Sequence, residues 1–183
     1  GAELKSYEFN RYKSKKKDQN TLNTVNILGD VDASSIAKGK VIANGVAYAR
    51  DLGNHPANEM TPTILASNAE KIAKSAGMKA TIFDVSEFQK MGLGSFYGVA
   101  QGSVGRVPAK MIIVEYNGGK KGDKPFALVG KGVTFDSGGI SIKPSPNMGD
   151  MKYDMCGSAA VMGLLKTVAE LKPAINIIFA IGA

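Results

Sequence analysis

Two lysines and two aspartates around a Gly-Gly corner are the residues of this chain best suited to chemistry. They lie in KGVTFDSGGISIKPSPNMGDMKYDM, residues 131–155. Asp136 comes five residues after Lys131 and directly before Ser-Gly-Gly, and Lys143 and Asp154 follow. Because carboxylates are hard oxygen ligands, the pattern predicts a divalent-metal site, and without His or Cys such a site favours Mg or Mn. The alternative is a pair of salt bridges at the end of a strand.

The two lysines would have different tasks in a metal site. Lys131 can bind a metal only as the neutral amine, which requires nearby dications to lower its pKa far below the usual ~10.4. Lys143 would stay cationic, and its ammonium could stabilise an oxyanion that develops at a polarised carbonyl. The pattern therefore separates a candidate ligand from a candidate catalytic cation.

The elements that must position these side chains alternate between strands and helices. The apolar run FALVG ends just before Lys131, and open α/β sheets bind ligands beyond the carboxyl ends of their strands. Helix caps are expected at Asp32 or Ser34, at Thr61, and in a capping box formed by Ser86 and Gln89. The expected strands are residues 24–29, 79–85, 110–116, 125–130 and 174–183, and the expected helices are residues 32–52, 61–77, 86–92 and 156–171.

This alternation predicts an α/β fold. We expect a three-layer α/β/α sandwich around a mixed, largely buried sheet, with helices on both faces. The strands at 110–116 and 125–130 are near-continuously apolar, which is typical of sheet interiors. The strongly apolar strand at 174–183 normally lies in the middle of a sheet, so we expect the sheet to be incomplete at its C-terminal side.

The composition excludes several classes of protein. Of the 183 residues, 44% are hydrophobic, enough for a real core, and the single cysteine, Cys156, excludes an internal disulfide and a Cys-based zinc site. Part of the net charge of +7 lies in RYKSKKKD, residues 11–18, which we interpret as a solvated face, with nucleic-acid binding as the alternative. No apolar run approaches the roughly 20 residues of a membrane span, and no signal-peptide pattern is present, so we expect a soluble, cytoplasmic protein.

The site motif also carries a family resemblance. VGKGVTFDSGGISIKP (129–144), followed by MKYDM (151–155) and a helix rich in small residues, resembles the leucine (cytosol) aminopeptidase family of dinuclear metallo-exopeptidases. Residues 1–17 resemble the end of that family's N-terminal domain, and ARDLGNHPANEMTP (49–62) resembles its entry into the catalytic domain. The resemblance implies an N-terminal-domain remnant at 1–31, a linking helix at 32–52 and the first half of the catalytic domain at 53–183.

The resemblance also implies roles for single residues. Lys131 and Asp154 would serve one metal, and Asp136 would bridge two metals, which would be Zn or Mn, with Mg or Co as further options. Lys143 would be the catalytic ammonium. Met151 would line the pocket for the first side chain of the substrate, with ordinary core packing as the alternative. His55, the only histidine, is not needed as a ligand, so we expect a loop or hydrogen-bonding role for it.

One family motif is absent from this sequence. Asn-Thr-Asp-Ala-Glu-Gly-Arg, which supplies another Asp, a Glu and the arginine that holds a bicarbonate, does not occur. The expected function is a two-metal aminopeptidase that releases N-terminal residues from peptides, with leucine-like preference and a hexameric assembly, and this chain is expected to be inactive alone. Two alternatives stay open: a non-catalytic fragment for assembly or binding, and a basic nucleic-acid-binding piece.

Overall fold

The computed structural model describes residues 1–14 and 22–183, and the lysine run Lys15–Lys17 therefore lies outside the described residues. Helices and strands alternate along most of the chain, as the sequence predicted. The elements are α1 (Ala2–Lys5), α2 (Ala33–Asn54), α3 (Pro62–Ser75), β1 (Lys79–Phe83), α4 (Val85–Lys90), α5 (Gly94–Ala100), β2 (Met111–Asn117), β3 (Phe126–Lys131), the 3-10 helix η1 (Met148–Met155), α6 (Cys156–Leu171) and β4 (Asn176–Gly182).

The strands of the described residues form one mixed sheet in the order β1-β2-β4-β3. β2 is antiparallel to both of its neighbours, whereas β3 and β4 are parallel and pair from Phe126↔Ile177 to Lys131↔Gly182. The expected α/β class and the mixed sheet are confirmed. The parallel pair matters for the site, because it brings the carboxyl ends of β3 and β4 to the same edge of the sheet.

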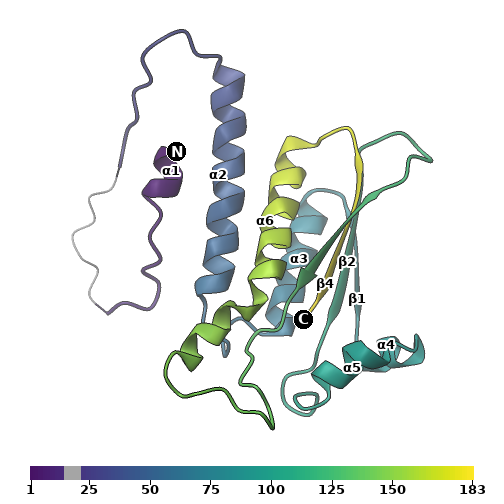
Figure 1. The fold of residues 1–183 in the computed structure, drawn as a ribbon. Helices are drawn as coiled ribbons and strands as arrows, with labels where there is room; N and C mark the ends of the chain where they lie inside the picture. The colour runs from purple at the N-terminus through teal and green to yellow at the C-terminus, as the bar shows by residue number, and fades with distance from the viewer. Residues whose placement is uncertain (15–21) are drawn as a thin grey trace.

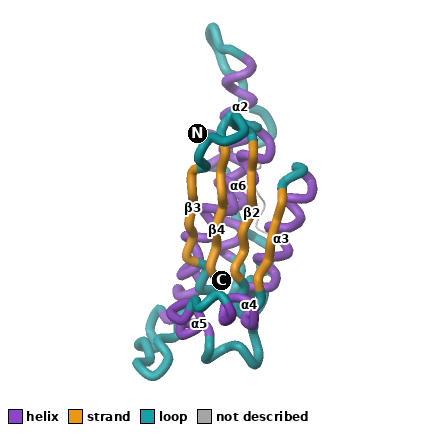
Figure 2. Tube along the Cα trace, turned by 90° about the vertical axis from the view of Figure 1, so that its right-hand side faces the viewer, coloured by secondary structure: helices purple, strands orange, loops and turns teal. Residues whose placement is uncertain are grey.

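The described helices cover mainly one face of this sheet, which Figure 2 shows with the strands in front of the helices. Side chains on the covered face, such as Ile112, Val114 and Phe179, are at most 1% exposed and pack against α3 and α6. On β3, which is an edge strand here, Phe126 is 64% and Val129 is 80% exposed. Among the described residues β3 is an edge strand with helices on one side, so it keeps its other face open.

Two glycines allow α2 to cross α6 closely (Figure 1). A Cβ atom at Gly45 would lie 2.0 Å from Thr167 Oγ1, and a Cβ atom at Gly163 would lie 2.6 Å from the carbonyl oxygen of Gly45. Gly45 lowers the helix propensity of α2, but a larger residue at this position would clash with α6. Branched residues of α2, such as Ile42 (44% exposed), lie on its outward side.

Three local expectations change in the structure. Residues 24–29 are not a strand: Leu28 is 95% exposed, and no described segment pairs with it. The capping box of α4 uses Asp84 and Glu87 in place of Ser86 and Gln89, because α4 begins directly after β1 and its N-cap is Asp84. Helix α5 was not expected, since its glycine-rich sequence has little helical pattern. Among the described helices, none has both the length and the apolar character that crossing a membrane requires.

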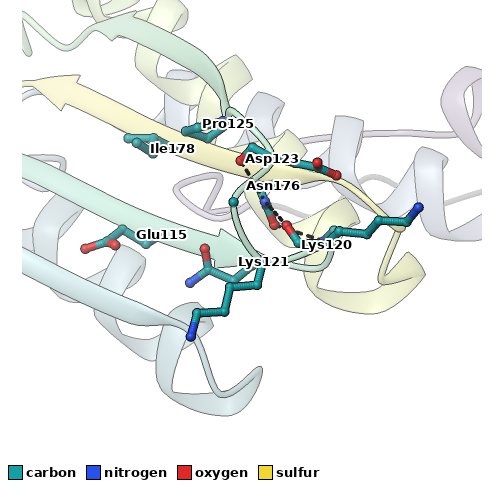
Figure 3. A pocket seen from close by; sticks show the side chains of 10 residues that line it. Glu115, Lys120, Lys121, Asp123, Pro125, Asn176 and Ile178 are labelled. Carbon is teal, nitrogen blue, oxygen red and sulfur yellow. Dashed lines mark hydrogen bonds between the residues drawn. The ribbon is translucent and has the colours of Figure 1, made fainter.

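A polar pocket lies at the end of the sheet where β3 and β4 begin (Figure 3). Its wall is ordered by Asn176, whose side-chain NH₂ donates to the carbonyl oxygens of Lys120 and Asp123 and whose Oδ1 accepts from the N–H of Gly119. Glu115, at the same pocket, pairs with Lys79 at 2.7 Å. The side chains of Asn176 and Glu115 thus already have partners within the turn and the sheet.

Candidate active site

The site is built where β3 passes the start of α6. A Cβ atom at Gly130 would lie 2.8 Å from the Cα atom of Ser158, and one at Gly157 would lie 3.2 Å from the backbone nitrogen of Lys131. Only backbone without side chains can approach so closely. The small residues at the start of α6 thus bring Lys131, at the end of β3, next to the segment that carries Asp154.

A tight turn in the loop after β3 holds Asp136. Its Oδ1 accepts a hydrogen bond from the N–H of Gly138 at 2.9 Å, and the N–H of Lys143 donates to the carbonyl oxygen of Ser137. Gly138 has a φ of 91°, and a Cβ atom there would lie 2.2 Å from the carbonyl oxygen of Ser141. A glycine is therefore required at this point of the Ser-Gly-Gly corner.

Two lysine–aspartate pairs bring the four predicted residues together. Lys131 Nζ lies 2.8 Å from Asp154 Oδ1, and Lys143 Nζ lies 3.3 Å from Asp136 Oδ2. The hydrogen bond to Asp154 raises the pKa of Lys131, with a further contribution from the charge of Asp136. The pKa of Asp136 is lowered, first by the N–H of Gly138 and then by Lys143. The arrangement contains the two salt bridges of the alternative interpretation, and because the charge of Asp136 also acts on Lys131, the four residues form one ion-paired cluster.

One carboxylate oxygen in this cluster has no partner. Asp154 Oδ2 is buried and accepts no hydrogen bond from any described residue. A buried carboxylate oxygen without a donor is costly, because it has lost water and gained nothing in exchange. A salt bridge to Lys131 accounts for Oδ1 alone, so the unpartnered Oδ2 is the feature that distinguishes this cluster from an ordinary pair of ion pairs.

A hollow of about 590 Å³ adjoins the turn of Asp136. It is mostly apolar and receives Phe96 and Val99 from α5, together with Phe135 and Ser137 from the loop after β3. Met151, the residue expected to contact the substrate, is partly buried on η1 and is not part of this lining. The predicted site residues thus divide between the ion-paired cluster and a methionine on the neighbouring 3-10 helix.

Sequence reasoning did not find Asn54 and Tyr153, which lie near the site. Asn54, the last residue of α2, accepts a hydrogen bond at its Oδ1 from the hydroxyl of Tyr153, the neighbour of Asp154, at 3.1 Å. The two residues are 99 positions apart, and no local pattern links them. The adjacent His55 shares a hydrogen bond of 2.5 Å with Tyr12 and packs edge-on against Phe9, which confirms its expected hydrogen-bonding role.

The fold and the cluster define a class of protein: an α/β domain with a carboxylate–lysine site at the carboxyl end of a parallel strand pair. Residues 47–183 match the profile described as "Cytosol aminopeptidase family, catalytic domain". This match covers most of the chain, and the chain belongs to the cytosol aminopeptidase family. The resemblance inferred from the motif around Asp136 is confirmed.

Curated relatives and solved structures agree with this assignment. A "Probable cytosol aminopeptidase" of Pseudomonas syringae pv. tomato is 46% identical over 178 residues, which are 94% of this chain and 36% of that protein. One of Methylobacillus flagellatus is 44% identical over 97% of this chain and 37% of its own length. A structure titled "Bottromycin maturation enzyme BotP in complex with Mn" matches with a TM-score of 0.80 and 29% identity over 99% of this chain and 37% of that one. The chain thus spans little more than a third of these relatives.

Proposed function

We propose that this chain supplies part of a two-metal active site in an aminopeptidase that releases N-terminal residues from peptides. The observation that carries the proposal is the buried, unpartnered Oδ2 of Asp154 beside Lys131. Such an oxygen gains strongly from a nearby cation, and carboxylates suit divalent metals. Membership of the cytosol aminopeptidase family and the Mn complex of the structural neighbour support a divalent metal here.

The residues of this chain fit such a site in part. Lys131, Asp136 and Asp154 would hold the metals, with Lys131 acting as the neutral amine. Within residues 1–14 and 22–183, however, no group of three or more His, Cys, Asp or Glu side chains clusters around a possible metal position. Two aspartates offset only half the charge of two dications, which repel each other strongly at close range. We therefore propose that further carboxylate ligands come from a part of the protein outside this chain.

Bound metals would supply the Lewis acid that polarises the scissile carbonyl and activates the attacking water. The residues of this chain would do the rest. Asp136 would bridge the metals, and the Gly138 N–H bond would hold its carboxylate in place. Lys143 would stay cationic and stabilise negative charge on the carbonyl oxygen, which requires its ammonium to turn away from Asp136. Met151 would contact the first side chain of the substrate.

The same proposal extends to the whole protein. It would prefer leucine-like N-terminal residues and use Zn or Mn, with Mg or Co as further options and a bicarbonate bound outside this chain. It would assemble as a homohexamer in the cytoplasm. Within the chain, residues 1–31 would be the remnant of an N-terminal domain, residues 32–52 a linking helix, and residues 53–183 the first half of the catalytic domain.

The test compares the hydrolysis of two substrates by the full-length protein that contains this chain. With Mn or Zn added, leucyl p-nitroanilide should be hydrolysed, whereas N-acetyl-leucyl p-nitroanilide should not, because its blocked amine cannot be bound as a free N-terminus. A chelator should abolish turnover and added metal should restore it. Equal hydrolysis of both substrates, or turnover that survives metal removal, would contradict the proposal. The 183-residue chain by itself should show no turnover.

A further inference from the structure

Residues 1–12, called the N-terminal segment here, lie alongside α2 and reach the C-terminal end of that helix (Figure 1). Arg50 donates to the carbonyl oxygen of Leu4 at 3.0 Å, and its guanidinium lies over the ring of Tyr7. The hydroxyl of Tyr7 donates to Asp51 at 2.7 Å and also receives a hydrogen bond from Asn54 at 3.1 Å. The segment is therefore attached to the last turns of α2, next to the 3-10 helix η1.

These hydrogen bonds form a chain with a defined direction. Tyr7 gives its only hydroxyl proton to Asp51, so its oxygen must accept from the NH₂ group of Asn54. That assigns the amide orientation and leaves the Oδ1 of Asn54 to accept from Tyr153. Burial and the hydrogen bond to Asp51 raise the pKa of Tyr7 to about 12, which keeps its proton in place at neutral pH. Asn54 is thus the joint between the N-terminal segment and η1.

The η1 helix depends on such outside contacts. Its N-cap, Asn147, has a left-handed backbone and makes no side-chain capping bond. At the other end, the buried Met155 and the hydrogen bond from Ser158 to its carbonyl oxygen hold the helix to α6. Between these points, Tyr153 is 42% exposed, and its hydroxyl bonds to Asn54. Lys152 Nζ also donates to the carbonyl oxygen of Asn54 at 3.5 Å, so the backbone just before Asp154 is held laterally to the end of α2, while Lys131 bonds to the Asp154 side chain itself.

We propose that Asn54 is a positioning residue through which the N-terminal segment holds Tyr153, and with it the backbone that aims Asp154 into the site. Tyr7 lies outside residues 47–183, the part that matches the catalytic-domain profile. The proposal thus assigns that segment a role in the geometry of the site. It rests on the proposed function only where Asp154 is taken as a metal ligand.

The experiment measures Mn²⁺ affinity of the full-length protein by electron paramagnetic resonance, together with hydrogen exchange of residues 148–155. Asn54→Leu removes both side-chain bonds at similar size, while Tyr153→Phe and Tyr7→Phe each remove one hydroxyl. Tyr12→Phe is the matched control, because Tyr12 docks the same segment through His55 and does not contact Asn54. Supporting groups of metal ligands typically change affinity by about 10-fold or more, so Asn54→Leu should weaken Mn²⁺ binding on the order of 10-fold.

The pattern across variants separates positioning from general stability. Tyr153→Phe should weaken Mn²⁺ binding and speed exchange in residues 148–155, and Tyr7→Phe should do the same more weakly. Combining either change with Asn54→Leu should add little, since the same hydrogen-bond chain is already broken. Tyr12→Phe should leave both readouts unchanged. If Asn54→Leu and Tyr153→Phe bind Mn²⁺ like the wild type and residues 148–155 exchange at the wild-type rate, the proposal is overturned. If the wild type itself binds no Mn²⁺, the metal function fails, and the exchange data alone decide the role of Asn54.

Discussion

Lys131 and Asp154, which are 23 residues apart in the chain, meet through a hydrogen bond of 2.8 Å between Nζ and Oδ1. The pair closes the gap between the end of β3 and the helix η1. It stabilises the charged form of Lys131, whereas Oδ2 of Asp154 remains without a partner among the described residues. The Oδ2 atom of Asp154 is thus available as a ligand where the proposed function requires one.

Asp136→Ala should abolish hydrolysis by the full-length protein. A carboxylate that bridges two cations has no substitute nearby, and its loss also frees the N–H of Gly138. Turnover and bound metal should be measured on the same preparation, with Asp150→Ala on the exposed side of η1 as the control. Near-normal turnover in Asp136→Ala would show that the bridging role is wrong.

Lys143→Ala should lower turnover by a factor of about 10² to 10³, as expected for the loss of one donor to a developing oxyanion. Bound metal should be retained, because Lys143 is assigned to the substrate and not to the metals. Metal analysis beside steady-state kinetics checks both points. Loss of metal in this variant would make Lys143 a structural partner of Asp136, as the ion pair at 3.3 Å would then indicate.

Gly163→Ala should destabilise the fold, and Gly39→Ala should not. Both glycines lie inside helices, where alanine is favoured by up to about 1 kcal/mol. At Gly163 a Cβ atom would lie 2.6 Å from the carbonyl oxygen of Gly45, and such overpacking typically costs about 1–3 kcal/mol. At Gly39 nothing lies within 4 Å. Urea unfolding of the two variants measures the difference, and equal stabilities would show that α2 and α6 can separate at little cost.

Asn176→Ala should cost about 1–3 kcal/mol of unfolding free energy, because the change leaves backbone groups of the 118–123 turn without their partner. The side chain is largely buried, and it makes three hydrogen bonds to that turn. Asn68→Ala is the control, since its single hydrogen bond to Ile64 is exposed. Denaturant midpoints give the costs, and a variant at 176 as stable as the control would mean that the turn holds without this amide.

The pH dependence of stability should contain a contribution from His55. Its pKa lies below the ordinary 6.5, first because burial disfavours the charged ring and then because of Arg11, while Asp51 and Glu59 act in the opposite direction. In the range below 6.5 the unfolded chain binds the proton first, so the free energy of unfolding should fall as pH falls from about 7.5 to about 5.5. Above this range both states are neutral and the contribution is complete.

His55→Gln isolates that contribution, because the chain contains no other histidine. The variant should lose the part of the pH dependence that falls between about pH 7.5 and about pH 5.5. Unfolding in urea at several pH values, with wild type and variant in parallel, provides the comparison. Identical slopes for the two proteins in this range would show that His55 titrates alike in the folded and unfolded states.

Much of the site was determined by local sequence. The apolar run that ends at Lys131 makes β3, and the Ser-Gly-Gly corner after Asp136 requires a backbone that only glycine adopts readily, with a φ of 91° at Gly138. Thr61 and Pro62 likewise begin α3 where the capping pattern predicts it. These features follow from residues within a few positions of one another, so they can be derived without knowing what lies across the fold.

Apart from the meeting of Lys131 with Asp154, which the family resemblance implied, the tertiary structure alone decided which distant residues meet. The approach of Gly157 to Lys131 brings the lysine to Asp154, and the end of α2 brings Asn54 to Tyr153. The edge position of β3 decided that Val129 is exposed, although its apolar sequence is typical of a buried strand. The physical reason is that burial and long-range hydrogen bonds depend on which surfaces are packed together. Local rules, such as the i, i+4 pairing of side chains on one helix, do not determine that choice.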